Sequence, residues 1–237
     1  DLNRAGTPLL EIVSEPDMRS SEEARAYMEE LRTVLRYINV CDGNLEEGSM
    51  RCDANISIMP KGSKEFGTRA EIKNVNSFSA LQRAIEYEID RQIDLVEAGE
   101  EVVQETRLWD DNQGITKSMR GKEDAHDYRY FPEPDLAPIV LSDEYVDGIQ
   151  AGLPEMPNVR RERYITELGL PEYDATQITN SKKMAEFFDK ATKKCGNAKL
   201  VSNWVMSDVS RKLNEAELEI DNIKFKCHKG TTEKLRD

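Results

Sequence analysis

The sequence predicts an α+β fold, with a largely antiparallel sheet and helices over residues 1–153 and a helical domain over residues 154–237. Three observations support this prediction. Two segments alternate between apolar and polar residues, as half-buried strands do. Other segments repeat apolar residues at helical spacing. Two prolines, Pro154 and Pro157, interrupt the chain where its composition changes, which indicates a domain boundary there.

The first elements begin close to the N-terminus. Residues 8–13 form an apolar run that predicts a short strand, broken only by Glu11. Ser20 followed by Glu23 is a capping-box pattern, and apolar residues then recur at helical spacing as far as Ile38. A helix is therefore predicted directly after the first strand.

Strict alternation marks residues 50–58 and 68–73 and predicts two strands that pair as a hairpin. In such a pair the polar residues share one face in two neighbouring rows. The first row is Arg51, Asp53, Asn55 and Ser57, and the second is Arg69, Glu71 and Lys73.

The remaining elements follow from the same rules. Asn76 or Ser77 can cap a long helix that Gly99 is placed to end. Strands are predicted at 102–109, 116–120 and 128–131, and helices at 158–168, 181–195 and 198–214.

Composition excludes several classes of protein. The net charge is −13, divided as −15 on residues 1–153 and +2 on residues 154–237. No apolar run approaches the roughly 20 residues that a membrane helix needs. The four cysteines lack zinc-site spacing and there are only two histidines, so oxygen ligands would have to hold any metal. The chain starts without Met inside a segment patterned like folded structure, which suggests a piece of a longer protein.

The two polar rows allow two interpretations. Cross-strand ion pairs on an exposed face would account for their charges without any function. Alternatively, carboxylates on the face hold Mg²⁺ and cations meet phosphate groups, which is what phosphoryl transfer requires. Glu11 also allows two interpretations: it is an outward, solvated residue, or it is a metal ligand. No glycine-rich phosphate loop is present, so any nucleotide site has another architecture.

Several long motifs occur in an order that resembles one family, the B subunits of the aspartyl/glutamyl-tRNA(Asn/Gln) amidotransferases. They are DLNRAGTPLLEIVSEPD at 1–17, EGSMRCDAN at 47–55, EIKNVNS at 71–77, ETR at 105–107, DYRYFPEPDL at 127–136, ELGLP at 167–171 and SNW at 202–204. The final stretch, residues 224–237, departs from the family pattern.

The resemblance implies a catalytic domain similar to that of glutamine synthetase, followed by part of a helical domain. Family members use ATP and Mg²⁺ to phosphorylate the side chain of Glu or Asp misacylated on tRNA(Gln) or tRNA(Asn), and ammonia then displaces the phosphate. The glutaminase (A) subunit supplies the ammonia, and the small (C) subunit holds the two larger ones together in a heterotrimer. The expected setting is bacterial cytoplasm or an organelle, with no membrane or DNA partner.

The resemblance also implies roles for individual residues. Glu11 matches a family ligand of the catalytic metal, whose partners, a His and a Glu, lie upstream of Asp1 in the family. Asp53 and Glu71 lie in family motifs and are expected to be further ligands of the metal or its waters. The cations expected to contact ATP or the acyl phosphate are Arg51, Lys73, Arg120 and Arg129.

Two alternatives to the amidotransferase function remain. The chain could be a non-catalytic module that docks tRNA or assembles the complex. It could also be a glutamine-synthetase-like ligase that acts on a free amino acid. A product assay comparing free Glu with Glu-tRNA separates the ligase from the amidotransferase.

Overall fold

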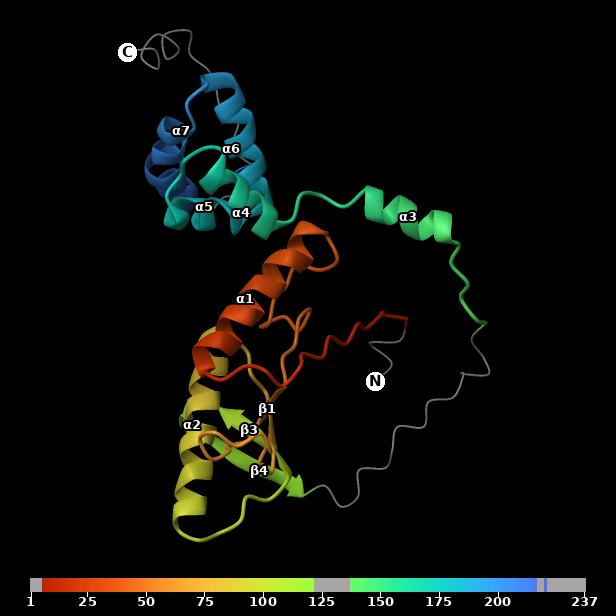
Figure 1. Ribbon diagram of the computed structural model, residues 1–237, viewed down its shortest axis with the longest axis vertical. Coiled ribbons are helices and arrows are strands. Elements are labelled where there is room, and N and C mark those ends of the chain that lie inside the picture. Colours follow the sequence, from red (N-terminus) through yellow and green to blue (C-terminus); the bar gives the residue numbers. More distant parts are fainter. Residues whose placement is uncertain (1–5, 122–136, 217–219, 221–237) are drawn as a thin grey trace. The chain divides into compact units, whose positions relative to one another are not determined.

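A computed structural model of the chain describes residues 6–121, 137–216 and 220, although not the side chains of Arg120 and Gly121 (Figure 1). The described residues divide into two units, and each is considered by itself. The first comprises residues 6–29 and 45–121, and the second comprises residues 30–44, 137–216 and 220. No helix in these ranges has both the length and the apolar character to cross a membrane.

The first unit contains a four-stranded sheet in the order β1-β2-β3-β4. Strands β1 and β2 pair antiparallel, β2 and β3 pair parallel, and β3 and β4 pair antiparallel. The predicted α+β class and the predicted pairing of the first two strands are confirmed. The strands are β1 Ala54–Ile56, β2 Ala70–Lys73, β3 Glu105–Asp110 and β4 Ile115–Gly121.

Helix α2, Phe78–Glu97, connects the two parallel strands, as a crossover connection must. The Ser77 hydroxyl caps it by accepting a hydrogen bond from the Ala80 amide at 3.0 Å, and Gly99 follows its end at φ +76°. Figure 1 shows α2 running alongside the sheet, and it contacts both β1 and β4. The predicted cap and the predicted end of this helix are confirmed.

Helix α1, Ser21–Tyr37, is also confirmed, with Ser20 as its cap. The Ser20 hydroxyl accepts from the Glu23 amide at 3.2 Å, while the Glu23 carboxylate accepts from the Arg19 amide at 2.6 Å. The reciprocal bond of a capping box is thus made one residue earlier than the pattern predicts. The division between the two units falls within this helix.

The strand predicted at residues 8–13 is wrong. The segment has no strand structure, and Leu9 and Val13 are 77% and 81% exposed. An apolar run predicts a strand only if a neighbouring strand receives its backbone hydrogen bonds, and no described strand pairs with it.

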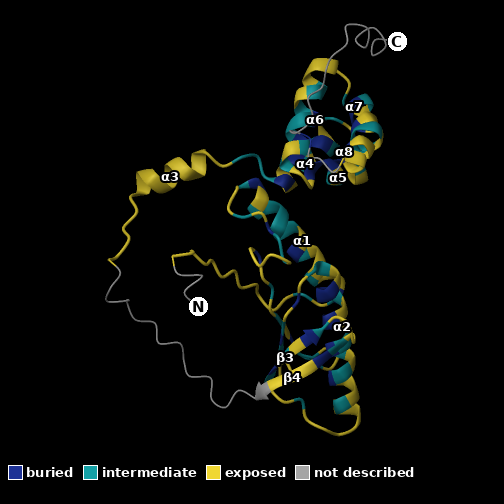
Figure 2. Cartoon of the chain, turned by 180° about the vertical axis from the view of Figure 1, so that it is seen from behind, coloured by how far each residue is buried: buried dark blue, intermediate teal, exposed yellow. Residues whose placement is uncertain are grey.

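The second unit is helical. Its helices are α3 Asp143–Ala151, α4 Pro157–Thr166, α5 Glu172–Thr179, α6 Lys182–Cys195, α7 Ala198–Trp204, a π-helical turn Val205–Val209 and α8 Ser210–Ala216. The sequence predicted the helices after residue 157 except α5, and it did not predict α3. Figure 2 shows α3 exposed along its whole length, and none of its residues is buried.

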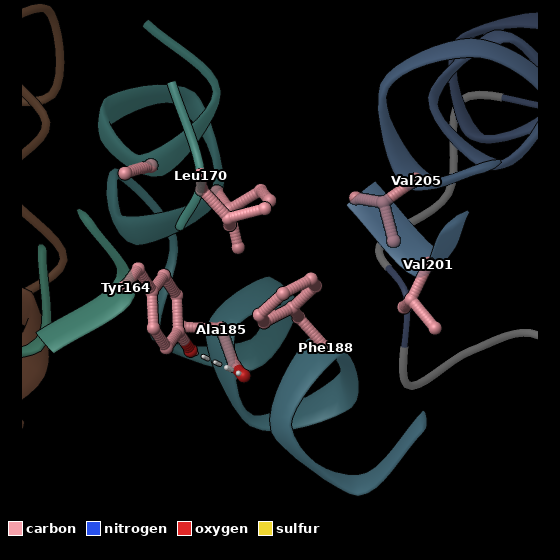
Figure 3. Close-up of a cluster of buried hydrophobic side chains, with 8 residues drawn as sticks. Tyr164, Leu170, Ala185, Phe188, Val201 and Val205 are labelled. Carbon is pink, nitrogen blue, oxygen red and sulfur yellow. Dashed lines mark hydrogen bonds between the residues drawn. The ribbon is translucent and has the colours of Figure 1, made fainter. Parts of the chain in front are cut away.

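The core of this unit is a cluster of buried side chains from α4 to the π-helical turn (Figure 3). The rings of Tyr164 and Phe188 lie 4.8 Å apart, and the Tyr164 hydroxyl donates to the Ala185 carbonyl at 3.1 Å. The aromatic pair and the satisfied hydroxyl give the unit its own packed core.

Residues 30–44 belong to this helical unit although they lie far from it in the sequence. Tyr37 is fully buried, and its hydroxyl donates to the Thr179 carbonyl at 2.7 Å. Lys182 donates to the Tyr37 carbonyl at 2.7 Å, and Arg161 pairs with Glu30 at 3.1 Å. The sequence-based division at 153/154 had assigned residues 30–44 to the first domain, and that division itself stays a prediction.

Candidate functional site

The register of β1 and β2 brings together part of the two predicted polar rows. Asn55 lies opposite Glu71, and Ile56 lies opposite Ala70. Ala70 and Ile72 are buried while Glu71 and Lys73 are half-buried, so the apolar and polar residues lie on opposite faces, as predicted. The polar face of these strands is called the open face below.

Lys73 is the centre of a charge cluster on the open face. Its ammonium lies 2.9 Å from Asp53 Oδ2 and 3.4 Å from Glu71 Oε1. The hydrogen bond to Asp53, followed by the attraction of both carboxylates, raises the pKa of Lys73. Lys73 is therefore charged at neutral pH, and its ammonium group keeps the carboxylates of Asp53 and Glu71 close to it.

Thr106 completes the hydrogen bonding of Glu71. It lies beside Glu71 in the parallel pairing of β2 and β3, and its hydroxyl donates to Glu71 Oε2 at 2.8 Å. Glu71 thus has one oxygen facing Lys73 and the other held by Thr106. The sequence gives no signal for this role of Thr106, because a hydroxyl between two charged residues does not stand out as a pattern.

Strand β4 bulges opposite Thr106. Glu105 pairs with Gly121 and Arg107 pairs with Ser118, so two residues of β4, Met119 and Arg120, face the single residue Thr106. The backbone therefore places the predicted cation Arg120 at the bulge, one strand away from Glu71. Bulges often re-aim side chains next to active sites.

The other predicted site residues are less closely connected. Arg51 is exposed, two residues before Asp53. Glu11 is exposed in the segment that lacks strand structure. Among the described residues, no three His, Cys, Asp or Glu side chains form a group that could hold a metal ion, so Glu11, Asp53 and Glu71 are not brought together as a preformed site. Arg129 lies outside the described residues, and its role stays a prediction.

A second charged cluster, which sequence reasoning missed, lies between α2 and the sheet. Its centre is Glu88, whose side chain is completely buried and pairs with Arg91 at 2.6 Å and with Arg107 at 3.5 Å. Arg107 also pairs with Glu105. Burial raises the pKa of Glu105, but hydrogen bonds from Ser118 and Arg107 outweigh it and leave the pKa below its ordinary value.

The sequence did contain a signal for Glu88. It occupies the same helical stripe as Leu81, Ala84 and Ile85, all of which are buried. A carboxylate on the apolar stripe of a helix must be paired to be buried. That position could therefore have been predicted to need a basic partner.

A surface hollow of about 410 Å³ lies elsewhere in the first unit and is lined by Ile58, Gly67, Thr68, Val96, Glu100, Glu101 and Val102. None of the predicted site residues lines it. Its charged residues are acidic, and an acidic lining is unsuited to phosphate groups. The open face therefore remains the candidate site.

The chain is similar to known proteins over most of its length. Residues 1–147 match the GatB/GatE catalytic domain, and residues 186–231 match the GatB domain. The chain is 58% identical over 222 residues to the aspartyl/glutamyl-tRNA(Asn/Gln) amidotransferase B subunit of Trichlorobacter lovleyi, a match that covers 94% of this chain and 47% of that protein. The B subunit of Geobacter sulfurreducens is 59% identical over 93% of this chain and 46% of its own length.

The same relation holds for a third organism. The B subunit of Thermodesulfovibrio yellowstonii is 55% identical over 95% of this chain and 48% of its own length. The chain thus spans about half the length of the curated relatives it matches. Because residues 1–147, more than half of the chain, match its catalytic domain and the relatives share this degree of identity, the chain belongs to the GatB/GatE catalytic domain family.

Proposed function

We propose that the chain is part of a tRNA-dependent amidotransferase that phosphorylates Glu or Asp on misacylated tRNA and converts it to Gln or Asn. The single observation that carries the proposal is the cluster on the open face. There, Asp53 and Glu71 lie 2.9 and 3.4 Å from the Lys73 ammonium. The cluster lies within the part of the chain that matches the GatB/GatE catalytic domain.

The chemistry of the reaction explains why ATP is needed. A carboxylate is a poor electrophile, so its oxygen first attacks the γ-phosphorus of ATP, and the bond to the leaving ADP breaks. Ammonia then attacks the acyl carbon, inorganic phosphate departs with the bonding electron pair, and the nitrogen loses a proton to give the amide. Both steps place negative charge on phosphoryl oxygens.

The cations of the site are suited to that charge. Lys73 is charged at neutral pH, and its ammonium can leave a carboxylate for a phosphoryl oxygen without changing its protonation. Arg120 lies at the β4 bulge, and its guanidinium is the kind of group that binds phosphate through two hydrogen bonds. Arg51 and Arg129 are proposed as further contacts to ATP or the acyl phosphate.

The carboxylates fit Mg²⁺, which binds oxygen ligands and is often held by one or two carboxylates together with substrate phosphates. Asp53 and Glu71 would hold it on the open face, and Glu11 is proposed as the third ligand. When bound, Mg²⁺ supplies positive charge that neutralises the phosphate oxygens of ATP. The Thr106 hydroxyl and the Lys73 ammonium contact the two oxygens of Glu71 and so orient its carboxylate on this face.

The proposed partners follow from the reaction. Ammonia has to be supplied without loss to water, which the glutaminase (A) subunit would provide, and the small (C) subunit would complete the complex. The relatives are named as B subunits, which is consistent with an assembly of several chains. The substrate would be misacylated Glu-tRNA(Gln) or Asp-tRNA(Asn).

The test is cleavage of ATP by the protein assembled with these subunits, in the presence of Glu-tRNA(Gln) and Mg²⁺. Glu71→Gln is expected to lower the rate by about tenfold or more, because it removes a charge that holds the metal. Glu11→Gln tests the third ligand in the same assay. Asp90→Asn, on the surface of α2 away from the cluster, is the control and should leave the rate unchanged.

Two results would count against the proposal. If the assembled protein cleaves ATP equally well with uncharged tRNA, or amidates free glutamate, a ligase acting on a free amino acid is the better interpretation. If it binds misacylated tRNA but cleaves no ATP, the chain is a docking or assembly module.

A further inference from the structure

We propose that Arg107 is a positioning residue for the open face and that it acts through Thr106 on the Glu71 carboxylate. The inference rests on the proposed function, because it assumes that Glu71 holds the cation of the site. It assigns a role to the charged cluster between α2 and the sheet, whose side chains do not reach the open face themselves.

Thr106 contacts Glu71 directly. Thr106 is only 8% exposed, and its hydroxyl donates to Glu71 Oε2 at 2.8 Å. A hydroxyl that holds one oxygen of a ligating carboxylate fixes the direction of the other oxygen. The position of Thr106 therefore decides where Glu71 presents its oxygen.

The position of Thr106 depends on its neighbour in the strand, Arg107. Consecutive residues of a strand point to opposite faces, so Arg107 lies on the helix side when Thr106 lies on the open face. The Arg107 guanidinium donates to Thr116 Oγ1 at 2.7 Å and to the Thr116 carbonyl at 2.9 Å. It also pairs with Glu105 and lies 3.5 Å from Glu88. These contacts restrain the Arg107 side chain and, with it, the adjacent peptide that carries Thr106.

Glu88, which pairs with Arg107, is itself held by several hydrogen bonds. Glu88 accepts from Arg91 at 2.6 and 3.0 Å and from Thr116 at 3.2 Å. Gln92 donates to Glu88 at 2.9 Å and to the Ile56 carbonyl at 3.1 Å. Glu88 thus connects α2 to β3 and β4, and its neighbour Gln92 connects α2 to β1.

The same charged residues lie beside the bulge of β4. Glu105 and Arg107 are the residues of β3 that flank it, and Ser118 of β4 donates to Glu105. A shift of register by one residue would move Thr106 to the wrong face. The charged cluster fixes the register at the point where β4 carries an extra residue, and so it fixes Thr106 opposite the bulge formed by Met119 and Arg120.

The test compares Arg107→Lys with Arg83→Lys in the assembled protein. Arg83 of α2 pairs with Asp111, in the turn directly after β3, much as Arg107 pairs with Glu88 of α2, but the Arg83 side chain is 48% exposed. Lysine keeps the positive charge at position 107 but lacks the planar guanidinium group, which contacts Thr116 and Glu105 at the same time. Thr106→Val removes the hydroxyl at nearly constant volume, and Thr106→Ser restores it.

Two quantities are measured. Hydrogen exchange reports the order of β2 and β3, and the Arg107→Lys variant should exchange the amides of 71–73 and 106–108 at least tenfold faster than Arg83→Lys. Binding of Mn²⁺ alone, followed by electron paramagnetic resonance, should weaken about 10- to 100-fold in Arg107→Lys and Thr106→Val. Thr106→Ser and Arg83→Lys should stay within twofold of the unmodified protein.

The outcomes separate the two proposals. If Glu71→Gln weakens Mn²⁺ binding but Arg107→Lys and Thr106→Val do not, the positioning role is overturned while the proposed function stands. If Glu71→Gln leaves Mn²⁺ binding unchanged, Glu71 does not hold the metal. Hydrogen exchange then decides alone whether Arg107 orders β2 and β3. Equal exchange in Arg107→Lys and Arg83→Lys overturns the positioning role in either case.

Discussion

Lys73 illustrates how far the sequence reaches at the scale of single residues. Alternation placed Asp53, Glu71 and Lys73 on one face, and the structure brings them together around one ammonium group. Thr106 and Glu88 were missed because their roles depend on which strand and which helix lie beside them. Periodicity gives the face of a residue, but only the tertiary structure gives its partner.

Glu155 provides a test of the electrostatics of the helical unit. Hydrogen bonds from Arg163 and then Arg160 outweigh burial and hold the pKa of Glu155 below its usual value of 4.5. The carboxylate therefore stabilises the fold above about pH 4.5, and this stabilisation is lost as the pH falls through the lowered pKa. The loss of unfolding free energy in Glu155→Gln should be largest near pH 7 and should shrink towards pH 3.

Urea denaturation at several pH values measures this difference. Glu162→Gln, on the surface of α4, is the control and should show little difference at any pH. A penalty for Glu155→Gln that does not depend on pH would contradict the assignment, because it would mean that the charge of Glu155 does not contribute.

Cys52 provides a second test at this scale. Burial, and then the neighbouring charge of Asp53, raise the pKa of the Cys52 thiol to about 11. Since the thiolate is the reactive form, Cys52 should be alkylated by iodoacetamide at pH 8 far more slowly than the exposed Cys195, by roughly a hundredfold. Peptide mass mapping over time measures both rates, and comparable rates would contradict the raised pKa of the partly buried Cys52.

At the scale of elements, α2 is the best-predicted part of the chain, because its cap, its apolar stripe and its terminal glycine all agree. Ser77→Ala should lower the free energy of unfolding by about 1 kcal/mol, since the amide of Ala80 loses its acceptor. Asn76→Ala is the matched control, because the sequence allowed either residue as the cap and the structure uses Ser77. Chemical denaturation measures both, and equal effects would contradict the cap.

Elements with fewer consistent signals were predicted less well. Helix α5 has eight residues, including several β-branched ones, and a proline in place of a capping side chain, so its pattern is too short to stand out. The segment at residues 8–13 had the composition of a strand but no described strand beside it. In both cases the missing information is a neighbouring element, which composition does not specify.

At the scale of the whole molecule, the helical unit is not one continuous stretch of sequence, since residues 30–44 are part of it. Tyr37→Phe should lower the free energy of unfolding of this unit by about 1–3 kcal/mol, because the buried Thr179 carbonyl loses the hydroxyl that donates to it. Tyr173→Phe is the control, because Tyr173 is 67% exposed. Thermal or urea unfolding compares the two, and equal stability would contradict the contribution of the hydrogen bond from Tyr37 to Thr179.

This arrangement has a consequence for limited proteolysis. The segment from Ile139 to Leu153 is exposed, so a protease should nick the chain there first. Tyr37, held by Thr179 and Lys182, would then be on the other fragment from most of the helical unit. The two fragments should therefore elute together from a sizing column under native conditions and separate only in denaturant, so a single cut divides the polypeptide without releasing a domain.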